Sequence, residues 1–128
     1  MIEVCNYIYH NYPEFRDLYA KWEILSFLDR NERNVLTINE GNKIKGVALF
    51  FSLTDEALKK IRTGDLDLNK PEDIKEAKRE KGDNIYITLV LAQGYKTIKK
   101  GIKKLFKKAK RVCWHEPDMS RLHIYKRR

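Results

Sequence analysis

Apolar side chains recur at spacings of three and four residues in the first quarter of the chain. Between residues 11 and 29 they are Phe15, Leu18, Tyr19, Trp22, Leu25 and Leu28. This spacing places them on one face of a helix and predicts a first long helix over residues 11–29. Pro13 suits the first turn of that helix, where its missing N–H has no intrahelical partner to lose.

Alternating apolar and polar positions follow, which is the pattern of strands. Residues 34–40 and 43–53 each predict a strand, and the Gly41-Asn42 link between them is typical of a tight hairpin. Thr54 is placed to cap a short helix that ends before Gly64. Residues 65–83 are polar and predict a loop with a helical segment from 71 to 81.

The remaining sequence predicts a strand, a basic helix and two further strands. Residues 85–91 are almost entirely apolar, as in a central strand. Residues 96–110 predict an amphipathic helix, in which Gly101 indicates close backbone packing. Residues 111–115 and 121–126 predict the last two strands. The order predicts one α+β domain over residues 1–128, with a mixed sheet and a right-handed crossover between parallel strands at 85–91 and 111–115.

Composition excludes several classes of protein. The chain has 128 residues, of which 42% are hydrophobic, so it can bury the core of one domain and is not typical of a disordered protein. Its longest apolar run, residues 47–51, is far shorter than the ~20 residues of a membrane-spanning helix. We expect no secretory signal, because no basic segment precedes a long apolar run, and we expect no disulfide framework or metal site from two cysteines. These features predict a soluble cytoplasmic protein.

Positive charge is concentrated near the C-terminus. Residues 96–128 contain 13 basic and two acidic side chains, whereas the whole chain has a net charge of +9. Eight of the basic side chains are lysines within residues 96–110. Such a field attracts nucleic acid, a phosphorylated cofactor or an acidic protein, and a solvated charged surface is the alternative interpretation.

The junction of the central strand and the basic helix reads VLAQGYKT over residues 90–97. Together with the element order, it resembles the GNAT acyltransferase superfamily, which binds the cofactor pyrophosphate at the start of this helix. Gln93 matches the first position of that superfamily's Q/R-x-x-G-x-G/A signature, while Lys96 and Ile98 occupy its small-residue positions. The resemblance implies a donor site formed by the residues that open the helix: Gln93, Gly94, Tyr95, Lys96, Thr97, Lys99 and Lys100.

A more specific similarity is to the toxin-activating lysine acyltransferases, over roughly residues 8–112. His10 precedes Pro13 as a His does in that branch, residues 53–56 are similar to its LT/S-x-E helix start, and Gly82-Asp83 opens the central strand. The proposed catalytic pair of the branch is a His and an Asp. His10 matches the His, but Thr88 occupies the Asp position, which implies altered or lost acylation chemistry. A small protein with this order of elements also resembles phage-encoded members of the superfamily.

Three side chains are candidates for catalysis. His10 is the candidate general base, and a helix-entry histidine bonded to backbone is the alternative. His115 is a second candidate, with a half-solvated residue at a strand end as the alternative. Tyr125 is a candidate proton donor to a leaving thiolate, a role that the superfamily often gives to a Tyr. Cys113 shares a face with His115, although buried free cysteines are far commoner than reactive ones.

These observations lead to one principal hypothesis and two alternatives. The first is an N-acyltransferase that moves an acyl group from acyl-CoA or an acidic acyl carrier protein to an amine, such as a protein lysine. The second is a non-enzymatic nucleic-acid-binding protein that uses the lysine-rich helix 96–110. The third is an interaction module that forms a homodimer through residues 47–51 or the final strand. The salt dependence of binding separates the first two.

Overall fold

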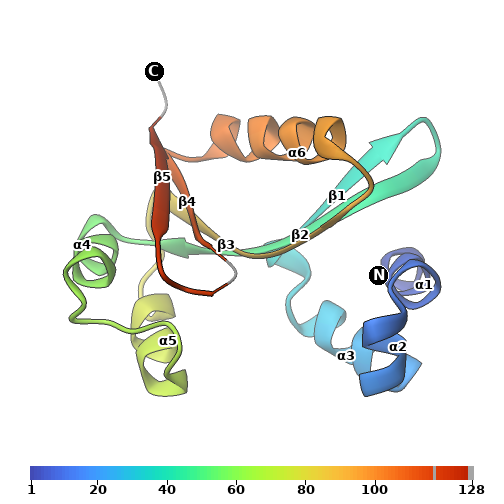
Figure 1. Ribbon diagram of the computed structural model, residues 1–128, viewed down its shortest axis with the longest axis horizontal. Coiled ribbons are helices and arrows are strands. Elements are labelled where there is room, and N and C mark those ends of the chain that lie inside the picture. The colour runs from blue at the N-terminus through green and yellow to red at the C-terminus, as the bar shows by residue number, and fades with distance from the viewer. Residues whose placement is uncertain (117, 127–128) are drawn as a thin grey trace. The chain divides into compact units, whose positions relative to one another are not determined.

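A computed structural model describes residues 1–116 and 118–126, apart from the side chain of Arg33. Figure 1 shows the element order. The helices are α1 (Ile2–Asn11), α2 (Pro13–Leu18), α3 (Lys21–Arg30), α4 (Asp55–Thr63), α5 (Pro71–Lys78) and α6 (Tyr95–Lys108), with a 3-10 turn at Glu32–Asn34. The strands are β1 (Val35–Glu40), β2 (Lys43–Leu53), β3 (Asn84–Ala92), β4 (Arg111–His115) and β5 (Leu122–Lys126).

The five strands form one mixed sheet in the order β1-β2-β3-β4-β5. β1 and β2 are antiparallel, β3 and β4 are parallel, and β4 and β5 are antiparallel. The sheet confirms the predicted α+β class and the central position of β3. It also confirms that the strands before and after α6 in the chain, β3 and β4, are parallel. Residues 47–49 pair with β1 and are therefore not a free sheet edge, whereas β5 is the last strand in the sheet order, and the predicted homodimer stays a prediction.

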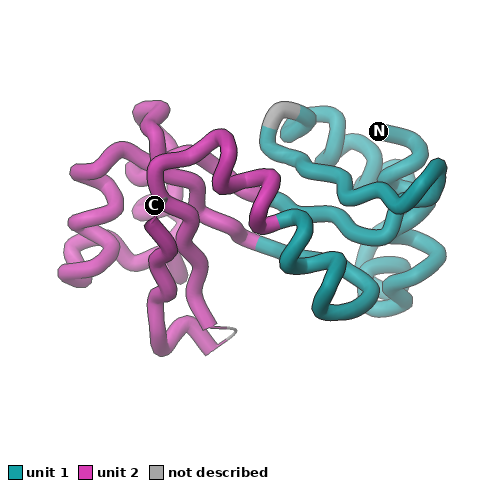
Figure 2. Tube along the Cα trace, turned by 90° about the horizontal axis from the view of Figure 1, so that it is seen from above, with its two compact units in different colours: residues 1–49, 89–101 teal, residues 50–88, 102–128 magenta. Residues whose placement is uncertain are grey.

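The chain divides into two compact units (Figure 2). The first unit comprises Met1–Leu49 and Leu89–Gly101, and the second comprises Phe50–Thr88 and Ile102–Arg128. The boundaries fall within β2, β3 and α6, so each of these elements contributes residues to both units. The single domain over residues 1–128 stays a prediction.

The first unit begins with three helices instead of the single long helix predicted over residues 11–29. Tyr12 leaves the helical conformation (φ −129°, ψ 83°), as a residue before proline tends to, so α1 ends before Pro13. Tyr19 and Ala20 are extended, and the Glu23 carboxylate accepts a hydrogen bond from the Ala20 N–H at 3.0 Å where α3 begins. The predicted apolar face is therefore divided between two helices, and Trp22 is 72% exposed.

The core of the first unit lies between the helices and the sheet. α1 contributes buried side chains at positions 4, 5, 7 and 8, a helical spacing that the sequence analysis did not use. Val47 of β2 and Leu91 of β3 pack against them. This pattern could have predicted α1.

Two glycines allow α6 to approach the β1–β2 hairpin within the first unit. The hairpin is tight as predicted, with Glu40 paired to Lys43. A Cβ on Gly46 would come within 3.1 Å of Ile38, Ala92 and Thr97, and a Cβ on Gly101 would collide with the Ile38 side chain. The close packing predicted at Gly101 is confirmed.

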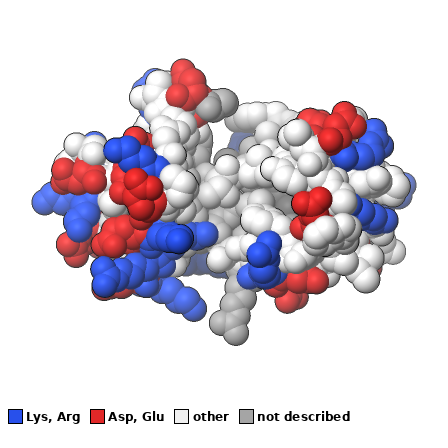
Figure 3. Space-filling model, turned by 90° about the horizontal axis from the view of Figure 1, so that it is seen from below, with Lys and Arg blue, Asp and Glu red and all other residues white. Residues whose placement is uncertain are grey.

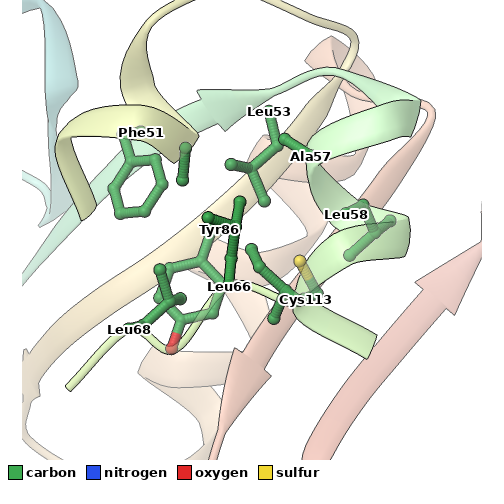
Figure 4. Packing of buried hydrophobic residues seen from close by; sticks show 10 residues of the cluster. Phe51, Leu53, Ala57, Leu58, Leu66, Leu68, Tyr86 and Cys113 are labelled. Atoms are coloured by element: carbon green, nitrogen blue, oxygen red, sulfur yellow. The ribbon is translucent and has the colours of Figure 1, made fainter. Parts of the chain in front are cut away.

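The second unit has its own core, formed by β2, α4, α5, β3 and β4 (Figure 4). Phe51, Leu53, Leu58, Tyr86 and Cys113 are among its buried side chains. The predicted start and end of α4 are confirmed: the Thr54 hydroxyl accepts a hydrogen bond from the Ala57 N–H at 3.0 Å, and Gly64 is left-handed with φ 86°. The segment predicted as a helix over residues 71–81 ends at Lys78.

The pairing of β3 with β4 is short. It joins Asn84, Ile85 and Tyr86 to Arg111, Val112 and Cys113, and β4 continues to His115 while paired with β5. The side chains of Tyr86 and His115 meet at the end of this short register. Among the helices in the described ranges, none combines the length and apolar character needed to cross a bilayer.

Candidate functional site

The residues predicted to bind a donor lie where β3 ends and α6 begins, in the first unit. Gly94 has φ +93°, a left-handed conformation that turns the chain from the strand into the helix. The first intrahelical bond of α6 is donated by the Ile98 N–H to the Gly94 carbonyl. The N–H groups of Tyr95, Lys96 and Thr97 precede it, at positions where helix N–H groups have no intrahelical acceptor and can bind an anion.

The side chains at this junction differ in what they contact. The Thr97 hydroxyl donates to the Gln93 carbonyl at 3.0 Å, and the Lys100 ammonium group donates to the Asn39 carbonyl at 3.4 Å. The side chains of Tyr95, Lys96 and Lys99 are exposed. The predicted donor-binding residues thus lie at one helix terminus, where Lys96, Lys99 and Lys100 are exposed and Lys100 is hydrogen-bonded to Asn39.

A hydrogen bond joins this junction to the end of α1. The Gln93 side chain donates to Asn11 Oδ1 at 3.2 Å, and the Asn11 amide in turn donates to the Tyr7 carbonyl at 2.9 Å. Lys45 connects the same elements, since its carbonyl accepts from the Gln93 N–H at 3.1 Å and from the Tyr7 hydroxyl at 3.0 Å. His10 precedes Asn11 and is exposed, with its ring edge-on to Tyr9.

An apolar cavity of about 410 Å³ also lies in the first unit. Its lining comes from α1, α2, α3, β2 and β3, and includes Ile8, Phe15, Leu28, Leu89 and Leu91. Ile8 lies two residues before His10, and Leu91 lies two residues before Gln93. Figure 3 shows, on one face of the molecule, separate groups of Lys and Arg and of Asp and Glu with other residues, drawn white, between them.

The predicted residue His115 lies in a different place, within the second unit. It lines an open hollow of about 740 Å³ together with Asp67, Asn69 and Ser120. Its Nδ1 is 2.6 Å from the Tyr86 hydroxyl. Burial lowers the pKa of His115, with Asp67 opposing that shift, while burial raises the pKa of Tyr86 to about 12. Both side chains are therefore neutral near pH 7, and the phenol can donate to the imidazole.

Tyr125 belongs to a stack of aromatic rings on β4 and β5. Its ring lies parallel to that of Trp114, with centroids 5.1 Å apart and an interplanar angle of 9°. His123 stacks on the same indole at 5.6 Å, and Phe106 of α6 meets Tyr125 edge-on at 6.2 Å. Tyr125 is 51% exposed, so this candidate proton donor is accessible to solvent.

Two further polar groups of the second unit have structural roles. Cys113 is fully buried, its thiol donates to the Ile85 carbonyl at 3.4 Å, and burial raises its pKa to about 12, so it is not a reactive thiolate. Asp55 accepts hydrogen bonds from Asn84 at 2.9 Å and from Arg111 at 3.1 Å. These contacts and Lys110 lower the pKa of Asp55 and hold the starts of α4, β3 and β4 together.

The hydrogen-bond partners of the candidate residues are not evident from the sequence. Tyr86 is predicted only as part of an apolar strand, because its contact with His115 depends on the register between β3 and β4. Tyr7 lies before the helix that the sequence predicts to begin at Asn11, and the contacts of Asn11 and Lys45 with Gln93 join residues far apart in the chain. Within the described ranges, His, Cys, Asp and Glu do not gather in groups of three or more that could hold a metal ion.

The chain was compared with protein-family models, with curated proteins and with solved structures, and none of these comparisons finds a match.

Proposed function

We propose that the chain is a GNAT-like N-acyltransferase, whose acyl donor binds at the start of α6. The observation that carries this proposal is the hydrogen bond from Gln93 to Asn11, which joins the end of α1 to the β3–α6 junction. Asn11, the residue after His10, is thereby held at the helix terminus at which a donor phosphate would bind. The element order and the parallel β3–β4 pair joined by α6 support the same proposal.

The donor is a thioester attached to a phosphorylated carrier, either acyl-CoA or an acyl carrier protein. Its phosphates would be bound by the N–H groups of Tyr95, Lys96 and Thr97 and by the ammonium groups of Lys96 and Lys99. The apolar cavity lined by Leu89 and Leu91 would hold the acyl chain, because both residues belong to the strand that leads into this junction. The acidic surface of an acyl carrier protein also suits the lysines of α6.

The proposed reaction is direct attack of an amine on the thioester carbonyl. The amine nitrogen forms a bond to the carbonyl carbon, the carbon–sulfur bond breaks, and the thiolate leaves. His10 accepts the proton that the amine loses and releases it to solvent, from which the thiolate takes up one proton to become the free thiol. Thr88 cannot act as a carboxylate base, so the proposal assigns proton removal to His10 alone.

The test is an acyl-transfer assay with His10→Gln. Wild-type protein is mixed with acyl-CoA or acyl-loaded carrier protein and with lysine-containing peptides. Free thiol and acylated peptide are both measured, and we expect them to form in equal amounts. We expect His10→Gln to reduce kcat by roughly 10²- to 10⁴-fold. Tyr125→Phe and His115→Gln, assayed in parallel, test the other two candidates. Equal rates for wild type and His10→Gln would overturn the assignment of His10, and no transfer from either donor would overturn the proposed activity.

A further inference from the structure

The aromatic stack on β4 and β5 lies within the most basic part of the chain. Residues 102–126 contain eight basic and two acidic side chains. Both acidic side chains have partners: Glu116 Oε1 is 2.7 Å from His123 Nε2, and Asp118 accepts from the Ser120 hydroxyl at 2.6 Å. Lys110 and Arg111 pair with Asp55, so most of the remaining positive charge of this region lies on the lysines of α6.

Four lysines of α6 supply much of this charge. They are exposed, and within residues 1–116 and 118–126 no carboxylate lies within 4.0 Å of their ammonium groups: Lys103, Lys104, Lys107 and Lys108. Phe106 contacts Tyr125. Lys103 lies three residues before Phe106, and Lys107 lies one residue after it. The helical spacing therefore places cations beside the aromatic rings.

The rings form an organised surface on one face of the β4–β5 pair. Trp114 is paired directly with His123 across the strands, and Tyr125 lies two residues further along β5 on the same face. Trp114 fixes the orientation of the Tyr125 ring by parallel stacking, while Tyr125 remains 51% exposed. An exposed ring held in place by its neighbours can accept a further flat group at little entropic cost.

We propose that this surface of the second unit binds single-stranded nucleic acid, with an unpaired base stacked on Tyr125 and phosphates bound by Lys103 and Lys107. Flat aromatic bases and a regularly charged backbone are the two features that this surface complements. A duplex exposes base edges in its grooves but keeps its base faces stacked internally, so it offers no free face to Tyr125. The proposal uses residues of the second unit and none of the donor-binding residues that open α6, which belong to the first unit. Tyr125 and the lysines of α6 also enter the proposed acyl transfer, where Tyr125 would act through its hydroxyl and not through its ring.

The test uses the intrinsic fluorescence of Trp114 in a Trp22→Phe background, which leaves Trp114 as the sole tryptophan. Oligo-dT of about 12 nucleotides is titrated into the protein at several salt concentrations. An abasic oligomer of equal length, a duplex and polyglutamate are titrated in parallel. We expect saturable quenching by oligo-dT, with roughly tenfold weaker binding of the abasic oligomer and the duplex.

Matched variants separate stacking from charge. Tyr125→Ala is expected to weaken oligo-dT binding roughly tenfold, whereas Tyr125→Phe, which keeps the ring, retains it. Lys103→Gln/Lys107→Gln is expected to lower the log–log salt slope by about 1.4, the value for two phosphates on a single strand. The control, Lys59→Gln/Lys75→Gln, makes the same change of charge on exposed positions of α4 and α5.

Three results would overturn the proposal. The first is equal affinity for oligo-dT and the abasic oligomer, or for oligo-dT and polyglutamate, because bases would then contribute nothing. The second is an unchanged affinity in a Tyr125→Ala variant whose circular dichroism matches that of Tyr125→Phe. The third is an equal loss of affinity in the two double-lysine variants, which would indicate general electrostatic attraction.

Discussion

The hydroxyl of Tyr86 lies 2.6 Å from Nδ1 of His115, where the short parallel register of β3 and β4 ends. Cys113 opposite Tyr86 is buried, and His115 lies two residues further along β4 on the same face. Tyr86 thus belongs to the core of the second unit, and its hydrogen-bond partner His115 lines the open hollow. This contact has a consequence for stability that can be measured.

The first prediction concerns the pH dependence of unfolding. Burial lowers the folded-state pKa of His115 below its usual 6.5, with Asp67 opposing the shift. The unfolded state then binds more protons than the folded state, so the contribution of His115 to stability is present above pH 6.5 and is lost as the pH falls through the lower folded-state pKa. We expect His115→Asn to unfold in urea with a weaker pH dependence than wild type over this range. An equal dependence would show that His115 titrates alike in both states.

The second prediction concerns the buried amide of Asn84. Its Nδ2 donates to the Leu53 carbonyl at 3.2 Å and to Asp55 at 2.9 Å, and its Oδ1 accepts from Arg111 at 3.3 Å. Asn84→Ala removes all of these bonds and leaves the Leu53 carbonyl without this donor. We expect a loss of ~2 kcal/mol or more in the free energy of unfolding, measured by urea denaturation. A change below ~0.5 kcal/mol would contradict the role assigned to this amide.

The third prediction concerns a close backbone approach in the second unit. A Cβ on Gly82 would collide with the Leu53 carbonyl and the Thr54 Cα, which are backbone atoms. They cannot rotate away, so Gly82→Ala is expected to cost about 1–3 kcal/mol of stability. The neighbouring exposed substitution Lys81→Ala is the control and is expected to change stability by less than about 0.5 kcal/mol. Equal melting temperatures for the two variants would show that the backbone at Leu53 and Thr54 can move to accommodate the added methyl group.

These features differ in how far the sequence could predict them. The hairpin, the Thr54 cap and the Gly64 end of α4 follow from local residue types, and each is confirmed. The helix predicted over residues 11–29 is wrong, because spacing alone does not reveal that Tyr12 and Ala20 leave the helical conformation. The Tyr86–His115 and Gln93–Asn11 contacts join residues 29 and 82 positions apart, so local patterns carry no signal for them.

The fourth prediction rests on the proposed function and concerns the length of the acyl chain. If the apolar cavity holds that chain, octanoyl-CoA binds more than tenfold tighter than acetyl-CoA, since each buried methylene contributes ~0.8 kcal/mol. Ser26 lines the cavity and is exposed, so Ser26→Trp is expected to narrow the cavity and reduce this preference. Glu14→Trp, on an exposed position outside the lining, is the control. Calorimetry measures both affinities, and a preference unchanged by Ser26→Trp would place the chain elsewhere.

The donor site at the start of α6 is the centre of the account, and the lysines there provide its most direct test. Lys96 and Lys99 are exposed in the first turns of the helix, whereas Lys59 and Lys75 are exposed on α4 and α5. The two pairs allow the same change of net charge to be made at the proposed site and away from it.

The measurement is a calorimetric titration of octanoyl-CoA, and separately of acyl carrier protein charged with the same chain, at about 0.15 M salt. We predict saturable binding of at least one donor by wild type, a loss of roughly tenfold or more in Lys96→Gln/Lys99→Gln, and little change in Lys59→Gln/Lys75→Gln. Equal affinities in the two double variants, or no binding of either donor by wild type, would contradict a donor site at this helix terminus.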